Sequence, residues 1–269
     1  MPIFVVVKNS NLLSHPAILH TIGRPLTVLP SVDSTNNYAM ALAIEGKAKH
    51  GAAFFALEQT AGKGQRGRQW LTAPGDNIIL STIIKPGELP FYQQFLLSAA
   101  MALSCYEFFK NYAGDETRIK WPNDIYWRDR KAAGILIENR LETAGGQAIW
   151  DWAIVGMGVN INQARFDGAF RNPVSLKQIT GRNFDVQALA TTLCEYQEKW
   201  WKKLSAGEGR DILRAYHEAM YRIGEKVKLK KDSSVFETNV CGVTEQGQLH
   251  TKDVMDRYFA VGEVEWVLD

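Results

Sequence analysis

The segment Lys120-Trp-Pro-Asn-Asp124 (KWPND) is followed after five residues by Arg130-Lys-Ala-Ala-Gly-Ile-Leu-Ile-Glu138 (RKAAGILIE). Pro122 fixes one backbone dihedral and biases Trp121 toward extended geometry. We therefore expect a strand to end here, with the two residues after the proline leaving it at a set angle. The second segment predicts a buried strand, and the lysine at its start can project into a cleft.

Strand and helix patterns alternate on both sides of these segments. Apolar periodicity predicts strands at 52–57, 78–84, 132–139 and 149–157, a turn at 143–146, and helices at about 35–44, 91–112, 186–204 and 212–220. The first ten residues, MPIFVVVKNS, also look like a strand. From Gly224 the chain changes to four or five short alternating strands in its last 46 residues, which is typical of a small β-barrel or sandwich. The sequence thus predicts an α/β or α+β body followed by an all-β tail.

The composition narrows the class of protein. The 269 residues are 46% hydrophobic and 22% charged, as in an ordinary soluble globular protein, and a net charge of +2 is too small to argue for a nucleic-acid binder. The three cysteines (105, 194 and 241) are far apart, so we expect reduced core thiols in a cytoplasmic protein. The N-terminus does not resemble a signal peptide, and the apolar runs are too short to cross a membrane.

The stretch Gly62–Trp70 (GKGQRGRQW) combines glycines in a GxGxxG spacing with three cations, which suits a backbone close to an anion. A dinucleotide-binding loop would open a helix at its third glycine. Here Gly67 is followed by Arg-Gln-Trp-Leu-Thr-Ala-Pro-Gly, which lacks helical periodicity and is stopped by its Pro-Gly pair. Kinase and Walker phosphate-loop motifs also fail, because their companion residues are missing. A mobile surface loop remains the alternative, but it leaves the coincidence of glycines and cations unexplained.

Two further segments are weak signals when taken singly. Ser34-Thr-Asn36 offers three hydrogen-bonding side chains at a helix start, where simple capping is the plainer interpretation. Gly156-Met-Gly-Val-Asn160 places two glycines at a strand end, where the asparagine could reach a nucleotide or the chain could simply turn. For Asn123 and Asp124 the choice lies between a turn and a contact with a ribose, an adenine or a magnesium ion. Lys131 could equally be a solvated lysine at a strand edge.

In this order the segments are specific, and the chain resembles the biotin protein ligases over about residues 28–269. The resemblance implies an α+β ligase body at 1–222, similar to the mixed sheet and helices of class II aminoacyl-tRNA synthetases. It implies a small C-terminal Src-homology-3-like β-barrel domain at 223–269. The implied reaction joins biotin to ATP, with Mg²⁺, to give biotinyl-adenylate and pyrophosphate. Biotin then passes to one lysine of a biotin carboxyl carrier protein.

The resemblance also implies roles for residues of this chain. Lys131 and Arg66 match catalytic positions, Lys131 as the lysine that bridges the biotin carboxylate and the α-phosphate. Biotin-binding positions are matched by Ser34, Thr35, Asn36, Gln59, Gly62, Lys63, Trp70, Lys131, Gly134, Gly156 and Gly158. Positions near ATP are matched by Gly64, Gln65, Arg66, Arg68, Lys120, Asn123, Asp124 and Asn160, with Asp124 as the candidate Mg²⁺ ligand.

Two departures from the family pattern matter. Gln65 stands where an arginine is common, which puts that arginine's role in holding the adenylate in question. Only about 27 residues precede the first ligase strand, fewer than the roughly 50 that a small domain needs, so a DNA-binding role is not expected. A lipoate ligase of the same fold and a non-catalytic biotin-binding regulator are the rival functions. The oligomeric state, monomer or homodimer, is left open.

Overall fold

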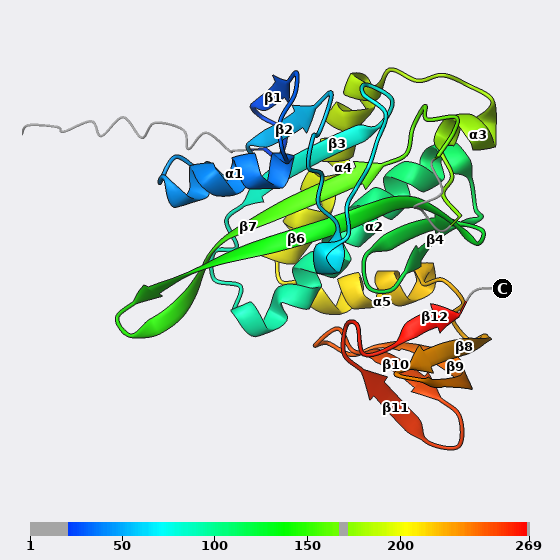
Figure 1. Cartoon of the computed structure of the whole chain (residues 1–269). Helices are drawn as coiled ribbons and strands as arrows, with labels where there is room; N and C mark the ends of the chain where they lie inside the picture. Colours follow the sequence, from blue (N-terminus) through cyan, green and yellow to red (C-terminus); the bar gives the residue numbers. More distant parts are fainter. Residues whose placement is uncertain (1–20, 167–171, 268–269) are drawn as a thin grey trace, which may run out of the picture.

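The computed structural model describes residues 21–166 and 172–267, so the strand expected in the first ten residues lies outside the described chain. Figure 1 shows a body in which helices cover a long sheet, and a smaller sheet formed by the C-terminal segment beneath it. This arrangement is α+β, as predicted. Among the described residues, no helix combines the length and apolar character that crossing a membrane requires.

A seven-stranded mixed sheet forms the body. Its strands are β1 (Leu26–Leu29), β2 (Ala53–Ala56), β3 (Ile78–Ile84), β4 (Thr117–Lys120), β5 (Asp124–Trp127), β6 (Arg130–Ala144) and β7 (Gln147–Val159). Their order across the sheet is β1-β2-β3-β7-β6-β5-β4. The β1–β2 pair is parallel and the other pairs are antiparallel. The interior strand β3 is buried along its whole length, as its run of β-branched residues predicts.

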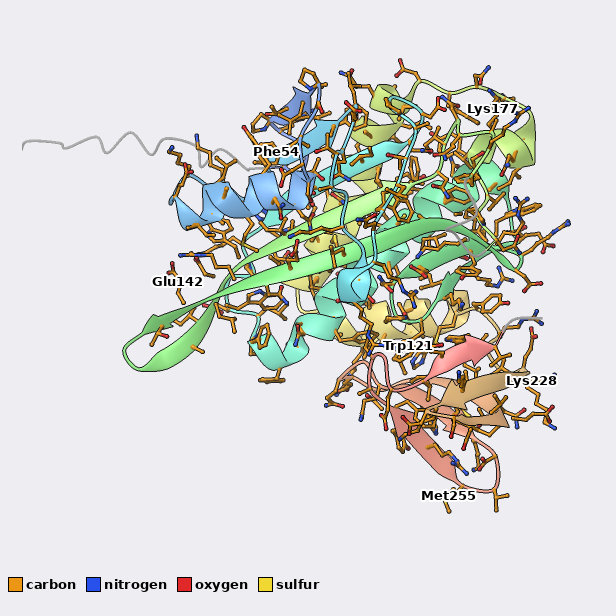
Figure 2. The ribbon with its side chains drawn as sticks, viewed as in Figure 1. Phe54, Trp121, Glu142, Lys177, Lys228 and Met255 are labelled. Carbon is orange, nitrogen blue, oxygen red and sulfur yellow. The ribbon has the colours of Figure 1, made fainter. Side chains whose placement is uncertain are left out.

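Helices cover both faces of this sheet. They are α1 (Thr35–Ile44), α2 (Gln94–Ala113), α3 (Leu176–Thr180), α4 (Val186–Ser205) and α5 (Gly209–Ala219). Phe54 packs with Ile83 and Ile154 in a small cluster beside α1, whereas its neighbour Phe55 belongs to the large core formed with α2, α4 and α5 (Figure 2). Successive residues of a strand point to opposite faces, and this alternation separates the two clusters.

The C-terminal segment forms a second, wholly antiparallel sheet. Its strands are β8 (Lys226–Lys231), β9 (Ser234–Val243), β10 (Leu249–Lys252), β11 (Asp256–Phe259) and β12 (Glu265–Val267), in the order β11-β10-β9-β8-β12. Five short strands agree with the prediction from sequence. Leu229, Val240 and Phe259 of this sheet belong to the same cluster of buried residues as α2 and α5. The smaller sheet is therefore packed firmly against the body.

Trp121 connects the KWPND turn to this second sheet, and Figure 2 labels it at the junction. Its indole Nε1 donates to the carbonyl oxygen of Gly247 at 2.9 Å. A Cβ on Gly247 would lie 2.4 Å from the ring of Phe95, so only glycine allows this close approach. The turn that carries the predicted site residues is thus tied to the second sheet through Trp121.

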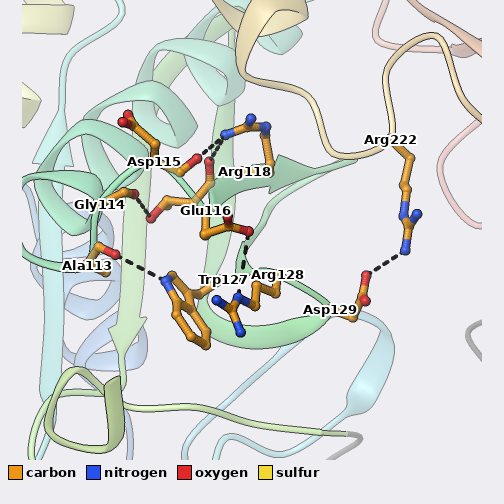
Figure 3. Close-up of polar contacts among 10 residues, drawn as sticks. Ala113, Gly114, Asp115, Glu116, Arg118, Trp127, Arg128, Asp129 and Arg222 are labelled. Atoms are coloured by element: carbon orange, nitrogen blue, oxygen red, sulfur yellow. Dashed lines mark hydrogen bonds and ion pairs between the residues drawn. The ribbon is translucent and has the colours of Figure 1, made fainter. Parts of the chain in front are cut away.

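The outer strands β4 and β5 are fixed by the contacts in Figure 3. Trp127 Nε1 donates to the Ala113 carbonyl oxygen at 3.1 Å, at the end of α2. Arg118 donates to the Asp115 carbonyl oxygen at 2.6 Å, and Arg222 Nη2 lies 2.8 Å from Asp129 Oδ1. These bonds tie the hairpin that carries KWPND to α2 and to the segment entering the second sheet.

The structure corrects three details. β6 and β7 are longer than expected, because cross-strand pairing continues to Ala144 and Gln147, and the turn is reduced to Gly145-Gly146, both at positive φ. The helix expected from 91 begins with a 3₁₀ turn, Phe91–Gln93. Cys105 and Cys194 are buried thiols as predicted, but Cys241 is exposed, because its side chain alternates outward in β9.

Candidate functional site

A cavity of about 1130 Å³ lies where the KWPND turn, β6, β7 and the second sheet meet the stretch Gly62–Trp70, which we call the glycine–cation loop. The predicted site residues line this cavity, except Gly62, which borders a hollow of about 480 Å³ beside the same loop. Segments that lie more than a hundred residues apart in sequence therefore converge on one site. Their separate roles stay predictions.

Glycines on β6 and β7 form a smooth floor under Trp70. Gly134 and Gly158 pair across the two strands. A Cβ on Gly158 would lie 2.3 Å from the Trp70 indole, and one on Gly134 would lie 3.2 Å from it. Gly156 gives the same room to Asn36, whose Oδ1 would lie 2.3 Å from an added Cβ. The glycine pair of the GMGVN segment does not turn the chain, because β7 continues through it to Val159. Instead, it lets an aromatic wall and a polar side chain approach the sheet.

The start of α1 forms the polar end of the cavity. Ser34 is its N-cap, but its side chain makes no capping hydrogen bond. Gln59 Oε1 accepts instead from the Thr35 amide at 2.8 Å, which satisfies one of the free N–H groups of the helix. Ser81 Oγ lies 2.7 Å from Thr35 Oγ1 and 2.6 Å from Asn36 Oδ1. Simple capping therefore does not describe these side chains, which are buried in a network across the cavity wall.

Glu138 completes that network. Its Oε2 accepts from Asn36 Nδ2 at 2.7 Å, and its Oε1 lies 3.6 Å from Lys63 Nζ of the glycine–cation loop. Neither Glu138 nor Ser81 was among the residues predicted for the site. A polar residue inside the apolar run of β3 was the available signal for Ser81, whereas the partner of Glu138 lies about a hundred positions earlier.

Lys131 lines the cavity and is paired with Asp124. Its Nζ lies 2.6 Å from Asp124 Oδ1 and 5.7 Å from the centre of the Trp70 ring. The side chains of Lys131 and Asp124 are 26% and 23% exposed, so both can still reach a ligand. Within residues 21–166 and 172–267, no three His, Cys, Asp or Glu side chains gather as a protein-only metal site requires. Asp124 therefore offers a single carboxylate.

Asn123 and Asn160 use their amide nitrogens to brace the site. Asn123 Nδ2 donates to the Ile135 carbonyl oxygen, and Asn160 Nδ2 donates to the Val174 carbonyl oxygen at 3.1 Å. Both asparagines also line the cavity. Because the donor side is engaged, a ligand contact from these residues would use Oδ1, which accepts hydrogen bonds.

The glycine–cation loop is a small closed hairpin. The Trp70 amide donates to the Gly62 carbonyl oxygen at 2.9 Å, and the Gly64 amide donates to the Arg68 carbonyl oxygen at 2.7 Å. A 3₁₀ turn, Gln65–Gly67, forms the tip, and extended backbone follows it. This confirms that no helix opens at Gly67, so the dinucleotide-binding interpretation is excluded by the backbone itself. At the tip, Arg66 Nη2 donates to the Val261 carbonyl oxygen of the second sheet at 3.2 Å.

The second sheet supplies a wall of the cavity that was not predicted from sequence. Val261, Gly262, Val264, Glu265 and Trp266 line the cavity. No local pattern in these residues signals a binding site, because their proximity to the ligase body depends on tertiary packing.

A cation and three aromatic rings join this wall to the body. Lys120 Nζ lies 4.5 Å from the Tyr126 ring centre and 5.8 Å from that of Trp266. The Tyr221 ring lies 5.5 Å from Tyr126 and 5.7 Å from Trp266. Burial, followed by a hydrogen bond to Asp129, raises the pKa of Tyr221 to about 12. The predicted nucleotide-side lysine is thus held among aromatic rings from both parts of the chain.

The sequence of this chain matches a known protein family and individual members of it. Residues 28–160 match the model of the biotin/lipoate A/B protein ligase family. The biotin–[acetyl-CoA-carboxylase] ligase of Paracoccus denitrificans is 32% identical over 231 residues, which cover 82% of this chain and 92% of that protein. The bifunctional ligase/repressor BirA of Escherichia coli (strain K12) is 35% identical over 173 residues, 64% of this chain. The match spans only about half, 51%, of the length of that protein.

A solved structure extends the likeness to the whole described fold. The biotin protein ligase from Aquifex aeolicus, determined in complex with biotin and ATP, superposes with a TM-score of 0.74 at 25% sequence identity. The match covers 91% of this chain and 99% of that one, so it includes the second sheet as well as the body.

Proposed function

We propose that this chain, which belongs to the biotin protein ligase family, is an ATP-dependent enzyme that attaches biotin to a biotin carboxyl carrier protein. One observation carries the proposal: the cavity joins an apolar wall, Trp70, to an ammonium, Lys131, and to a loop of cations. That combination suits a substrate with an apolar body and an anionic end that must meet a phosphate.

In the first half-reaction, a biotin carboxylate oxygen attacks the α-phosphorus of ATP. A bond forms between them, the bond from that phosphorus to the bridging oxygen breaks, and pyrophosphate leaves with the electron pair. Both reactants are anions, so the step requires positive charge in a site that excludes water. Lys131 would leave Asp124 and lie between the carboxylate and the α-phosphate, while Arg66 and Arg68 face the polyphosphate.

In the second half-reaction, the amine of the carrier lysine attacks the carbonyl carbon of the mixed anhydride. An amide forms, and AMP leaves with the electrons of the broken bond. Trp70 on its glycine floor would hold the biotin rings, and the Thr35–Gln59–Ser81 network would receive their polar groups. Keeping water from the anhydride is the task of the closed glycine–cation loop.

Asp124 is the residue that would hold Mg²⁺. A single carboxylate fits this ion, which is usually bound through one or two carboxylates together with substrate phosphates rather than in an all-protein cage. The ion would neutralise phosphate charge, and the residues of the chain would position the reacting groups.

We also propose the finer architecture that the resemblance implies. The seven-stranded sheet would correspond to the class II aminoacyl-tRNA synthetase core, and the five C-terminal strands to a Src-homology-3-like barrel, with a domain boundary at 222/223. The start of a separate five-stranded antiparallel sheet after Tyr221 supports this division.

A carrier-domain assay tests the function. The full chain is incubated with biotin, MgATP and a biotin carboxyl carrier domain, and the carrier is weighed by mass spectrometry. A single biotinyl addition that requires ATP is expected. An unmodified carrier, together with no biotin-dependent release of pyrophosphate, would refute the proposal.

Lipoate ligation is the second candidate, because the matched family model includes lipoate ligases. Lipoate replaces biotin in the same pyrophosphate assay. The name of the Paracoccus relative, which matches over most of its length, favours biotin. Faster pyrophosphate release with lipoate than with biotin would reverse the assignment.

A further inference from the structure

We propose that the turn between β11 and β12, residues 260–264, positions Arg66 and so holds the glycine–cation loop closed over the cavity. We call this turn the latch. Gly262 is the positioning residue within it, because it gives the Arg66 guanidinium its place. The inference rests on the proposed function for its enzymatic readout, but the loop's closure can also be measured without ligands.

The contact between the two segments is close. Arg66 Nη2 donates to the Val261 carbonyl oxygen at 3.2 Å, across 195 positions of sequence. A Cβ built on Gly262 would lie 1.2 Å from Arg66 Nη2 and 1.6 Å from its Cζ. The guanidinium therefore occupies the volume that any other residue at position 262 would fill. A side chain at position 262 and this position of Arg66 exclude each other.

The loop is built to present this arginine. Arg66 has a φ of 59°, a left-handed conformation that is uncommon for a residue other than glycine, and Gly67 follows at 72°. The 3₁₀ turn Gln65–Gly67 lies at the tip of the closed hairpin and directs the guanidinium toward the second sheet. A strained backbone persists only where its surroundings hold it, and the latch supplies such a contact.

The latch itself is braced. The Ala260 amide donates to Glu263 Oε2 at 3.0 Å, and the Glu263 amide donates to the Ala260 carbonyl oxygen at 3.0 Å. Lys231 of β8 pairs with the same Glu263 carboxylate, and Val264 is buried. The turn is therefore a fixed wall, and the loop is the part that closes against it.

The acceptor's chemistry explains why the contact serves the reaction. Lys131 and Lys63 are paired with the carboxylates of Asp124 and Glu138. Arg66 donates instead to a neutral carbonyl, which orients its guanidinium without cancelling its charge. A positioned, uncancelled cation at the rim of the cavity can retain an anionic adenylate until the carrier lysine arrives.

Substitutions at Gly262 test the latch. Gly262→Ala and Gly262→Asn both insert a Cβ, and asparagine tolerates the positive φ of 85° better. Gly224→Ala and Gly224→Asn are the matched controls, because Gly224 also has a positive φ, 75°, but an added Cβ meets no atom within 4 Å. The controls reproduce the backbone strain without touching Arg66.

The enzymatic readout is the partition of adenylate between release into solution and transfer to the carrier. A general loss of folded enzyme lowers both products but leaves their ratio unchanged. We expect the Gly262 variants to raise the released fraction about tenfold, the factor for one lost charge-assisted hydrogen bond, and the Gly224 variants to leave it unchanged. In an Arg66→Ala background, Gly262→Ala should add nothing further. Equal ratios for both glycines, or additive effects with Arg66→Ala, would overturn the proposal.

Limited trypsin digestion of the ligand-free full chain provides the independent readout. Cleavage after Lys63, Arg66 or Arg68 requires the loop to open, and the Gly262 variants should be cut there several-fold faster than the Gly224 variants. A wild-type protein that makes no adenylate would refute the proposed function but not the latch. Cleavage rates that do not differ would refute the latch even in an active enzyme.

Discussion

The position of Lys131 was predicted from its neighbours in sequence, whereas its partner is visible only in the tertiary structure. Its place before a small-small-glycine sequence predicted a lysine that projects into a cleft, and the structure puts it 2.6 Å from Asp124 inside the cavity. The carboxylate keeps the ammonium oriented before substrates arrive. Preorganised charge of this kind is worth most where charge develops in the transition state.

Replacing Lys131 by alanine should therefore abolish most adenylate formation while the chain stays folded. By analogy with lost oxyanion-hole donors, the cost is about 2.7–4 kcal/mol, or roughly a hundred- to a thousandfold in rate. Biotin-dependent pyrophosphate exchange measures it, with Lys177→Ala, on α3 and outside the cavity, as the control. Exchange within threefold of wild type would exclude Lys131 from the reaction.

The contact between Gly158 and Trp70 leads to a prediction about biotin binding. In Gly158→Ala the new Cβ would lie 2.3 Å from the indole, so the ring must move and biotin should bind more weakly. Titration calorimetry measures the affinity. In a Trp70→Ala background the same substitution has no ring to displace, and we expect little additional loss. If Gly158→Ala weakens binding equally in both backgrounds, the ring contact is not the cause.

Among the secondary-structure elements, the β6–β7 hairpin has two parts, of which only one lines the cavity. Its inner part carries Lys131 and the glycine floor, whereas its outer part extends beyond the body (Figure 1). Leu141 and Ile149 in the outer part are 45% and 48% exposed. The pairing of Arg140 with Asp151 marks the base of this extension.

Shortening the hairpin by replacing residues 142–149 with a two-residue turn should leave adenylate formation within about twofold, since the removed backbone is exposed and paired only with itself. Pyrophosphate exchange and transfer to the carrier are measured side by side. Arg140→Ala is the comparison variant, which should lower the thermal midpoint by loosening the base. Normal exchange with failed transfer would show that the outer hairpin contacts the carrier.

At the scale of the whole molecule, the body and the second sheet share a buried core and a cavity. Tyr221 and Arg222 lead from α5 into the second sheet and both contact Asp129, which follows β5. The hydrogen bond from Tyr221, followed by that from Arg222, holds the pKa of Asp129 below its ordinary value of 3.8. The junction is therefore sensitive to acid.

A lowered carboxyl pKa in the folded state contributes stability above the unfolded pKa, and this contribution is lost as the pH falls through the folded pKa. Wild type should consequently exceed Asp129→Asn in stability most clearly near pH 7, and the difference should vanish as the pH falls through the lowered pKa of the folded state. Urea unfolding across this range measures the difference. Asp115→Asn, another carboxylate of the β4–β5 edge, serves as the comparison. A difference that persists unchanged at low pH would mean that the carboxylate charge is not involved.

Sequence patterns predicted the elements well where the pattern is local. The apolar run of β3 and the proline of the KWPND turn carry their constraint in adjacent residues, and the predicted site residues converged on one cavity. The hairpin length was underestimated, because periodicity weakens where both faces of a strand reach solvent. Ser81 and Glu138 were missed, because their meaning lies in partners that are distant in sequence.

From the amino-acid sequence alone one could infer the family, most of the strands and helices but not β5 or α3, and the presence of a lysine, a tryptophan and a cationic loop suited to one chemistry. Only the tertiary structure decided that Trp70 stands on Gly134 and Gly158, that Lys131 rests on Asp124, and that the second sheet forms a wall of the cavity. The physical reason is range. Dihedral preference and periodicity act between neighbours, whereas the position of the Arg66 guanidinium depends on an acceptor 195 residues away, brought near only when both parts bury a common core.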